Sequence, residues 1–177
     1  MARNLLFLFI FFLIYGCLPA KKIIPADSFS SQSVPVVTGS LVNSAAFERG
    51  GTIALGLFKP GPEAAANEET DSLSLMLIKG IKETLLKEKT HFTIAEDEQK
   101  NPDFLLEGYI ENYAKAKRFS HTEAHLSVDG EIGLRETGEK ILLFQSSAVI
   151  NLKNQDPLGV AYQMGVAIAH FIGSQTN

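Results

Sequence analysis

The fold is decided by residues 102–152, PDFLLEGYIENYAKAKRFSHTEAHLSVDGEIGLRETGEKILLFQSSAVINL. From Ala124 to Leu134 the even positions carry apolar residues or glycine and the odd positions are mostly polar, which is typical of a strand with one buried face. After a turn at 136–139, the apolar residues stay on even positions from Leu142 onward. Pairing of Leu134 with Leu142 would join the two apolar faces. The stretch therefore predicts three consecutive antiparallel strands.

Residues 52–58 and 71–88 are predicted to form the strand and the helix that precede this meander. The strand is apolar on both faces, so we expect it to be central and covered on both sides. The helix places Leu73, Leu77, Ile78, Ile81 and Leu85 on one side at helical spacing. Thr70, Asp71 or Ser72 can cap its free amides.

A short strand at 91–95 and a final helix at 158–172 complete the predicted elements. Asp156 can cap this helix, and Pro157 at its first turn has no amide hydrogen to leave unpaired. Small residues recur at every fourth position of the helix and predict close packing against a sheet or another helix. They are Ala161, Gly165, Ala169 and Gly173. The predicted fold class is α+β, a single mixed and largely antiparallel sheet with two packed helices, in the order β-α-β-β-β-β-α.

The chain is predicted to have three parts: a lipoprotein signal peptide at 1–16, a lipidated flexible tether at 17–48 and an α+β periplasmic domain at 49–175. The tether is rich in Ser, Pro and Val. In an alternative interpretation, residues 34–41 add an edge strand to the sheet.

Residues 13–17, LIYGC, resemble a bacterial lipobox that follows a short apolar run. The resemblance implies that Cys17 becomes the first mature residue and carries acyl chains, which give lasting membrane anchoring. The alternative is an ordinary signal peptide that is cut after Ala20. Because Leu18 is not an aspartate, the resemblance favours the outer membrane, with the domain facing the periplasm.

Composition excludes several classes of function. With 16 basic and 20 acidic residues among 177, the net charge of −4 argues against nucleic acid as a partner. The single cysteine excludes an intrachain disulfide and a cysteine-rich metal site. The sequence has no phosphate-binding loop, nucleophile elbow or zinc-binding histidine pair. We expect no enzymatic activity, catalytic residue, metal or cofactor.

One strand nevertheless carries four side chains that resemble a metal or acid–base cluster: Glu123, His125, Asp129 and Glu131. Alternate residues of a strand lie about 7 Å apart, too far for neighbours to share one ion unaided. In the predicted register their cross-strand neighbours, Lys153, Asn151, Ser147 and Gln145, are poor ligands. We therefore expect a solvated or partner-binding face.

Other residues suggest a surface for a protein partner. Leu75 and Leu86 fall on the polar side of the first helix, and Gln163 and His170 interrupt the apolar last helix. A basic and aromatic group follows the first meander strand, in a segment at 114–120 that we expect to be a tight connection. It comprises Lys115, Lys117, Arg118 and Phe119.

Three short segments resemble envelope lipoproteins related to the periplasmic domain of the curli secretion channel. Residues 102–108 are similar to that family's Ala-Asp-aliphatic-Glu-Gly strand, residues 137–142 to its Thr-Gly-Glu turn, and residues 165–169 to its closing helix. The amino-terminal domain of TolB and the lipoprotein activators of penicillin-binding proteins are similar more loosely. The resemblance covers about 51–173 and implies an envelope domain without a catalytic motif.

Three functional hypotheses follow. The first is a lipid-anchored periplasmic accessory or scaffold protein that binds a protein of an envelope assembly. The second is a homo-oligomeric ring subunit that supports a secretion or flagellar channel built by other chains. The third is a ligand-binding or hydrolytic envelope protein that uses the face with Glu123, His125, Asp129 and Glu131.

Overall fold

The computed structural model describes residues 34–88, 90–95, 101–117 and 121–175. The predicted signal peptide, Cys17, Arg118 and Phe119 lie outside the described residues. Residues 33–177 form one compact unit.

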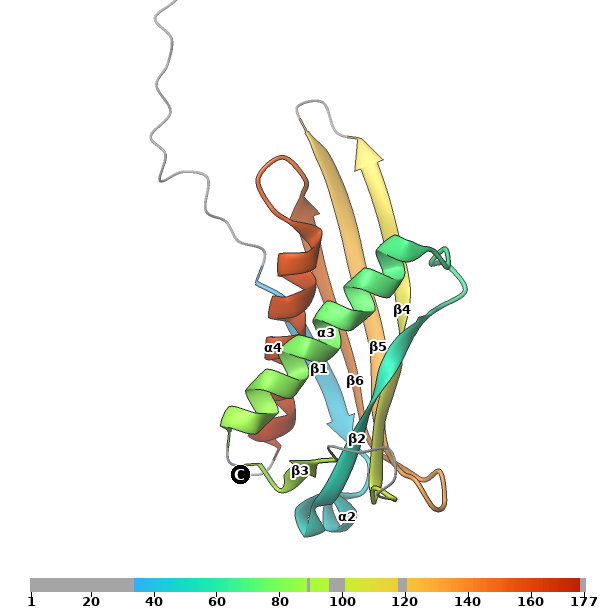
Figure 1. Cartoon of the computed structure of the whole chain (residues 1–177), viewed down its shortest axis with the longest axis vertical. Helices are drawn as coiled ribbons and strands as arrows, with labels where there is room; N and C mark the ends of the chain where they lie inside the picture. Colours follow the sequence, from blue (N-terminus) through green and yellow to red (C-terminus); the bar gives the residue numbers. More distant parts are fainter. Residues whose placement is uncertain (1–33, 89, 96–100, 118–120, 176–177) are drawn as a thin grey trace, which may run out of the picture. The chain divides into compact units, whose positions relative to one another are not determined.

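The structure is a mixed α+β domain with a six-stranded sheet in the order β1-β6-β5-β4-β2-β3. Strand β2 is parallel to β3 and β4, and the other pairs are antiparallel. The long helices α3 and α4 lie on the same face of the sheet (Figure 1). The predicted fold class is confirmed. The elements are β1 (Val36–Leu41), α2 (Ser44–Arg49), β2 (Gly51–Pro60), α3 (Glu68–Lys87), β3 (Phe92–Ile94), β4 (Phe104–Lys117), β5 (Thr122–Leu134), β6 (Lys140–Asn151) and α4 (Pro157–Ser174).

The alternation of the meander is confirmed, but its predicted register is wrong by two residues. Even-numbered side chains of β5 and β6 face the helices and are mostly buried. Leu142 pairs with Ile132, whereas Leu134 pairs with Phe104 and donates its amide to the carbonyl of Glu139. An irregularity after Ile132 and a longer turn account for the shift. Because the shift is an even number, the buried face is preserved.

The tether prediction is wrong for its last part, because residues 36–41 form β1 and residues 44–49 form α2. Strand β1 pairs antiparallel with β6 and is the edge strand proposed in the alternative interpretation. Asn43 caps α2 by accepting a hydrogen bond from the amide of Ala46. Helix α2 then buries Phe47 completely in the core.

Two further predictions are wrong in part: that both faces of β2 are covered, and that residues 114–120 form the connection between β4 and β5. Strand β2 is covered on one face only, since Leu57 is exposed and α3 packs on the opposite face. The predicted tight connection at 114–120 is shorter, because β4 and β5 stay paired as far as Lys117 and Thr122.

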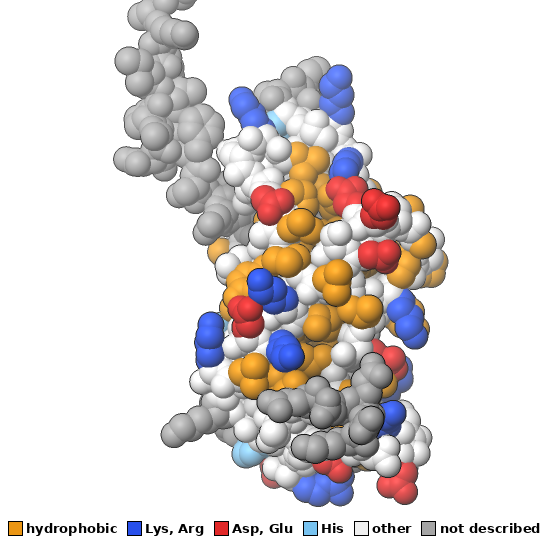
Figure 2. Space-filling model, in the orientation of Figure 1, with side chains coloured by type: hydrophobic (Ala, Val, Ile, Leu, Met, Phe, Trp, Pro, Cys, Tyr) orange, Lys and Arg blue, Asp and Glu red, His pale blue; other side chains and the backbone are white. Residues whose placement is uncertain are grey.

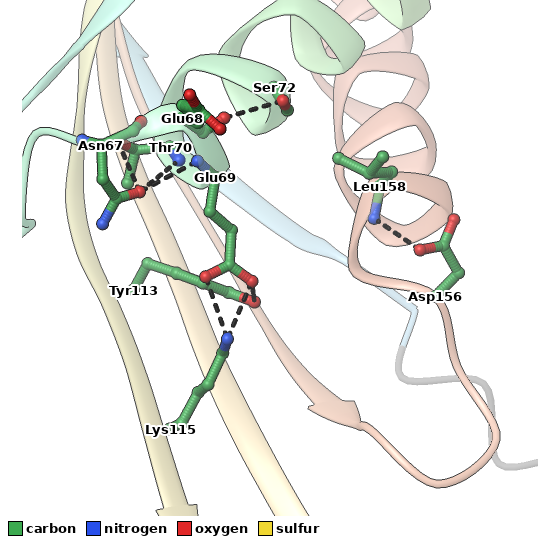
Figure 3. Close-up of polar contacts among 9 residues, drawn as sticks. All are labelled: Asn67, Glu68, Glu69, Thr70, Ser72, Tyr113, Lys115, Asp156 and Leu158. Atoms are coloured by element: carbon green, nitrogen blue, oxygen red, sulfur yellow. Dashed lines mark hydrogen bonds and ion pairs between the residues drawn. The ribbon is translucent and has the colours of Figure 1, made fainter.

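Helix α3 begins one turn before the predicted start. Asn67, not Thr70, Asp71 or Ser72, is the cap, and its side chain accepts hydrogen bonds from the amides of Glu69 and Thr70 (Figure 3). The backbone amide of Asn67 in turn donates to the Thr70 hydroxyl, which completes a capping box. Glu68, Glu69 and Asp71 occupy the first helical turn, where the helix dipole favours negative charge.

Helices α3 and α4 cross at a glycine contact, as the small residues of the last helix predicted. A side chain added at Gly80 would meet the carbonyl oxygen of Tyr162 at 2.2 Å, and one added at Gly165 would meet that of Leu77 at 2.2 Å. Asp156 caps α4, as expected, by accepting from the amides of Leu158 and Gly159 (Figure 3). No helix of the described residues is long and apolar enough to span a membrane.

Replacing Ser146 by Ala should raise the free energy of unfolding by about 1 kcal/mol. This side chain is 3% exposed on the helix-facing side of β6, and its hydroxyl has no hydrogen-bond partner among the described residues. Urea unfolding followed by circular dichroism measures the effect. Ser147→Ala, at the exposed neighbouring position, is the matched control and should change stability by less than about 0.5 kcal/mol. A loss of stability in Ser146→Ala would contradict the prediction.

Candidate functional site

The sheet face opposite α3 and α4, termed here the uncovered face, is the candidate site. It carries the odd-numbered residues of β5, and those of β6 from Leu143 onward, which are exposed or half-buried. Tyr109 of β4, Leu143 and Val149 of β6 and Val36 of β1 are large apolar side chains exposed on this face. A sheet that buries only one face commonly presents polar side chains on the other, so these apolar residues mark a surface suited to contact.

A row of glycines and phenylalanines crosses the sheet, and the rings of Phe58 and Phe144 lie on the helix side of the sheet. The paired residues run from Phe58 through Gly108, Gly130 and Phe144 to Gly39. On the helix side, the ring of Phe58 occupies the space that a side chain at Gly108 would need. The ring of Phe144 likewise occupies the space that a side chain at Gly130 would need. Glycine allows this close approach of a ring to the backbone of a neighbouring strand.

A hollow of about 490 Å³ lies on the uncovered face, directly behind that row. Four strands contribute to it: β1, β4, β5 and β6. Its charged and polar lining comprises Glu107, Tyr109, Asp129, Glu131, Lys140 and Gln145.

The electrostatics of the hollow are dominated by carboxylates. Glu107 and Glu131 lie directly opposite each other on β4 and β5, an arrangement of like charges that destabilises a sheet. Lys140 Nζ contacts Glu131 Oε2 at 2.6 Å, and this hydrogen bond raises the pKa of Lys140 above its usual value. Asp129 accepts a hydrogen bond from Gln145 Nε2 at 3.2 Å. Three carboxylates with one ammonium group leave two net negative charges.

The four side chains predicted to share one strand face do so, but they are engaged separately. Glu123 contacts His121 Nε2 at 2.7 Å, Asp129 contacts Gln145 and Glu131 contacts Lys140. His125 is exposed. In the observed register the residues opposite Glu123, His125, Asp129 and Glu131 are Asn151, Val149, Gln145 and Leu143. Within the described residues, no three His, Cys, Asp or Glu side chains are placed to hold a metal ion.

The predicted partner-surface residues fall on separate parts of the domain. Leu75 and Leu86, 59% and 62% exposed, lie on the outer side of α3. Gln163 and His170 are exposed on α4, where His170 Nδ1 forms an ion pair with Glu88. Their role in partner binding stays a prediction.

Lys115 has a structural contact at the end of β4. Its ammonium group and the Tyr113 hydroxyl both donate to the carboxylate of Glu69, in the first turn of α3 (Figure 3). The hydrogen bond from Lys115 holds the pKa of Glu69 below its usual value, while burial and the Glu69 carboxylate raise that of Tyr113. Lys117 is exposed at the end of the strand.

Glu107, Tyr109 and Lys140 belong to the candidate site but were not predicted from the sequence. Glu107 and Tyr109 lie opposite Glu131 and Asp129, so they share the uncovered face. The alternation of apolar residues along 104–110 contains this signal, because it places both residues on the polar side of the strand. Only the pairing of β4 with β5 connects them to the predicted cluster.

No family model and no curated protein matches the sequence. Among solved structures, the chain is similar to the PelC dodecamer from Paraburkholderia phytofirmans, with a TM-score of 0.57, 12% identity, and coverage of 78% of this chain and 97% of PelC. A PelC variant from the same organism gives a TM-score of 0.55 at 13% identity, with the same coverage. The chain has the PelC fold. Lipoprotein GNA1162 from Neisseria meningitidis, 9% identical over 70% of this chain and 98% of its own, has a TM-score of 0.47, too low to support an argument.

Proposed function

We propose that this chain is a non-enzymatic, lipid-anchored scaffold or accessory subunit of the bacterial cell envelope, which assembles with further copies of itself. The observation that carries the proposal is the uncovered face, where apolar side chains surround a hollow with unbalanced negative charge. The fold shared with PelC, which crystallises as a dodecamer, supports self-assembly over other modes of association.

The envelope location is supported by the sequence. The lipobox at 13–17 favours acylation of Cys17, and Leu18 after it favours the outer membrane. Two or more acyl chains stabilise membrane binding enough to make the anchor lasting. The resemblance to lipoproteins related to the curli secretion channel supports the same location.

The proposal of a non-enzymatic role rests on the sequence, which has no phosphate-binding loop, nucleophile elbow or zinc-binding histidine pair, and is consistent with the contacts of the candidate side chains. Glu123, Asp129 and Glu131 each contact a different neighbour. His125, Ser127 and Ser147 line one hollow of the uncovered face, but no hydrogen bond joins the histidine to either serine in the described residues. Carboxylates engaged in this way suit a surface that attracts a charged partner.

The test uses the full chain, expressed in bacteria with its own amino terminus and purified in mild detergent. Sedimentation and native mass spectrometry over a wide range of protein concentrations should give a defined oligomer. A monomer at every concentration would overturn self-assembly.

The anchor is tested in the same preparation by feeding the cells a labelled fatty acid. The wild-type chain should carry the label, and Cys17→Ser should lose it and leave the membrane fraction. Equal labelling of both chains would contradict the predicted site of acylation.

A further inference from the structure

Two surfaces on opposite sides of the domain are complementary in charge and share an apolar character. The α3 surface comprises Leu75, Lys79, Lys82 and Leu86, and the sheet surface comprises Glu107, Tyr109, Asp129 and Leu143. We propose that the α3 surface of one copy docks on the sheet surface of the next. The inference rests on the proposed self-assembly and names the interface that performs it.

The α3 surface is a single stripe of exposed side chains. Its residues are spaced by four, three and four positions, so they follow one another along one side of the helix. Neither Lys79 nor Lys82 pairs with a carboxylate among the described residues; the nearby Glu83 accepts instead from the Tyr162 hydroxyl at 2.8 Å. Figure 2, which views the domain from the helix side, shows basic groups set among hydrophobic side chains over α3.

The sheet surface has the opposite character. Tyr109 and Leu143 expose apolar area beside the hollow. Among the described residues, the carboxylates of Glu107 and Asp129 form no direct ion pair, and Lys140 acts on Glu107 only through the longer-range field. The like charges of Glu107 and Glu131 cost stability in the isolated domain, and Lys140 offsets one of them. Lysines from another molecule would offset the others.

A second copy meets these requirements if it is oriented head to tail. A symmetric contact would place lysine against lysine or carboxylate against carboxylate, which is unfavourable. The two surfaces lie on opposite sides of a two-layer domain. Helix α3 packs on one face of the sheet (Figure 1), and the residues that line the hollow lie on the other face. Contacts between two different surfaces generate a closed ring when the rotation between copies closes and an open filament when it does not. Because the two surfaces lie on opposite sides, a ring built from them has many members, and each copy turns only slightly relative to the last.

The test exchanges the charges of the two surfaces in the full, detergent-purified chain. One variant carries Lys79→Glu with Lys82→Glu, and the other carries Glu107→Lys with Asp129→Lys. Each variant alone presents like charges at every contact, and we expect its association to weaken about 100-fold, measured by sedimentation. An equal mixture should assemble again, because each kind of contact then joins opposite charges.

The matched control for the helix variant is Arg135→Glu with Lys153→Glu, which lowers the net charge by the same amount at exposed positions in two turns. It should assemble like the wild type. Circular dichroism establishes that every variant is folded, and recovery in the mixture independently excludes a folding defect. Continued assembly of both charge-reversed variants alone, or failure of the folded mixture to assemble, would overturn this interface while leaving self-assembly intact. A monomeric wild type would overturn both.

Discussion

Gly165→Val should lower the free energy of unfolding by about 3 kcal/mol or more, the largest effect that we expect from a single substitution in α4. A side chain at this position would lie 2.2 Å from the carbonyl oxygen of Leu77 and 3.0 Å from the amide nitrogen of Ile81. Both are backbone atoms of α3, so no rotamer change can relieve the overlap. The helices would have to separate and lose packing along their contact. Guanidinium unfolding, monitored by far-ultraviolet circular dichroism, measures the loss.

Gly159→Ala is the control in the same helix. The nearest atom to a side chain added there is an Asp156 carboxylate oxygen at 3.6 Å, which is an ordinary contact distance. Because alanine favours the helix more than glycine does, this variant should be unchanged or more stable by up to about 1 kcal/mol. Equal effects of the two substitutions would show that the helix crossing is not tight.

Phe47→Ala should lower the free energy of unfolding by about 3–5 kcal/mol. Phe47 is fully buried, and its ring lies edge to face against Phe92 with centroids 5.1 Å apart. Phe92 makes a similar contact with Phe104 at 5.2 Å, so the residue belongs to a cluster that joins α2, β3 and β4. Removing the ring leaves a cavity at this junction. Urea unfolding measures the resulting loss in the free energy of unfolding.

Val42→Ala is the matched control for the same segment. Val42 is 56% exposed, only a few residues before Phe47, and its truncation should cost less than about 0.5 kcal/mol. A large difference between the two variants would establish that residues 36–49 belong to the folded domain. If both were neutral, these residues would act as the tether that the sequence alone predicted.

The meander was the most predictable part of the fold, because its signal is local. Alternation along β5 and β6 specifies which side of each strand is buried, whichever partner the strand has. The start of α4 was equally clear, since Asp156 and Pro157 are both strong signals for a helix amino terminus.

The errors arose where distant pairing decides the structure. Strand β1 has few large apolar residues and gains its structure from β6, about 100 residues later. The predicted register failed because an irregularity after Ile132 cannot be seen in the alternation. Helix α3 was predicted one turn short because its acidic first turn resembles a loop until Asn67 is recognised as the cap.

The candidate site was predictable only in part for the same reason. The side chains on β5 could be placed on one face from the sequence, but the hollow is formed by four strands. Its like-charge pair, Glu107 and Glu131, appears only when β4 and β5 are placed in register.

The position of β1 has a consequence for folding. It is the first strand to be synthesised, yet Leu41 pairs with Leu142 of β6. At a synthesis rate of about 5–20 residues per second, β1 stays without its partner strand for about 5–20 s. During that interval β1 can pair instead with β6 of a neighbouring chain whose own β1 has not yet docked, which is a route to domain swapping. The domain is therefore completed from its carboxyl-terminal half back to β1, and a chain that ends before Ser147 lacks part of the β6 segment with which β1 pairs.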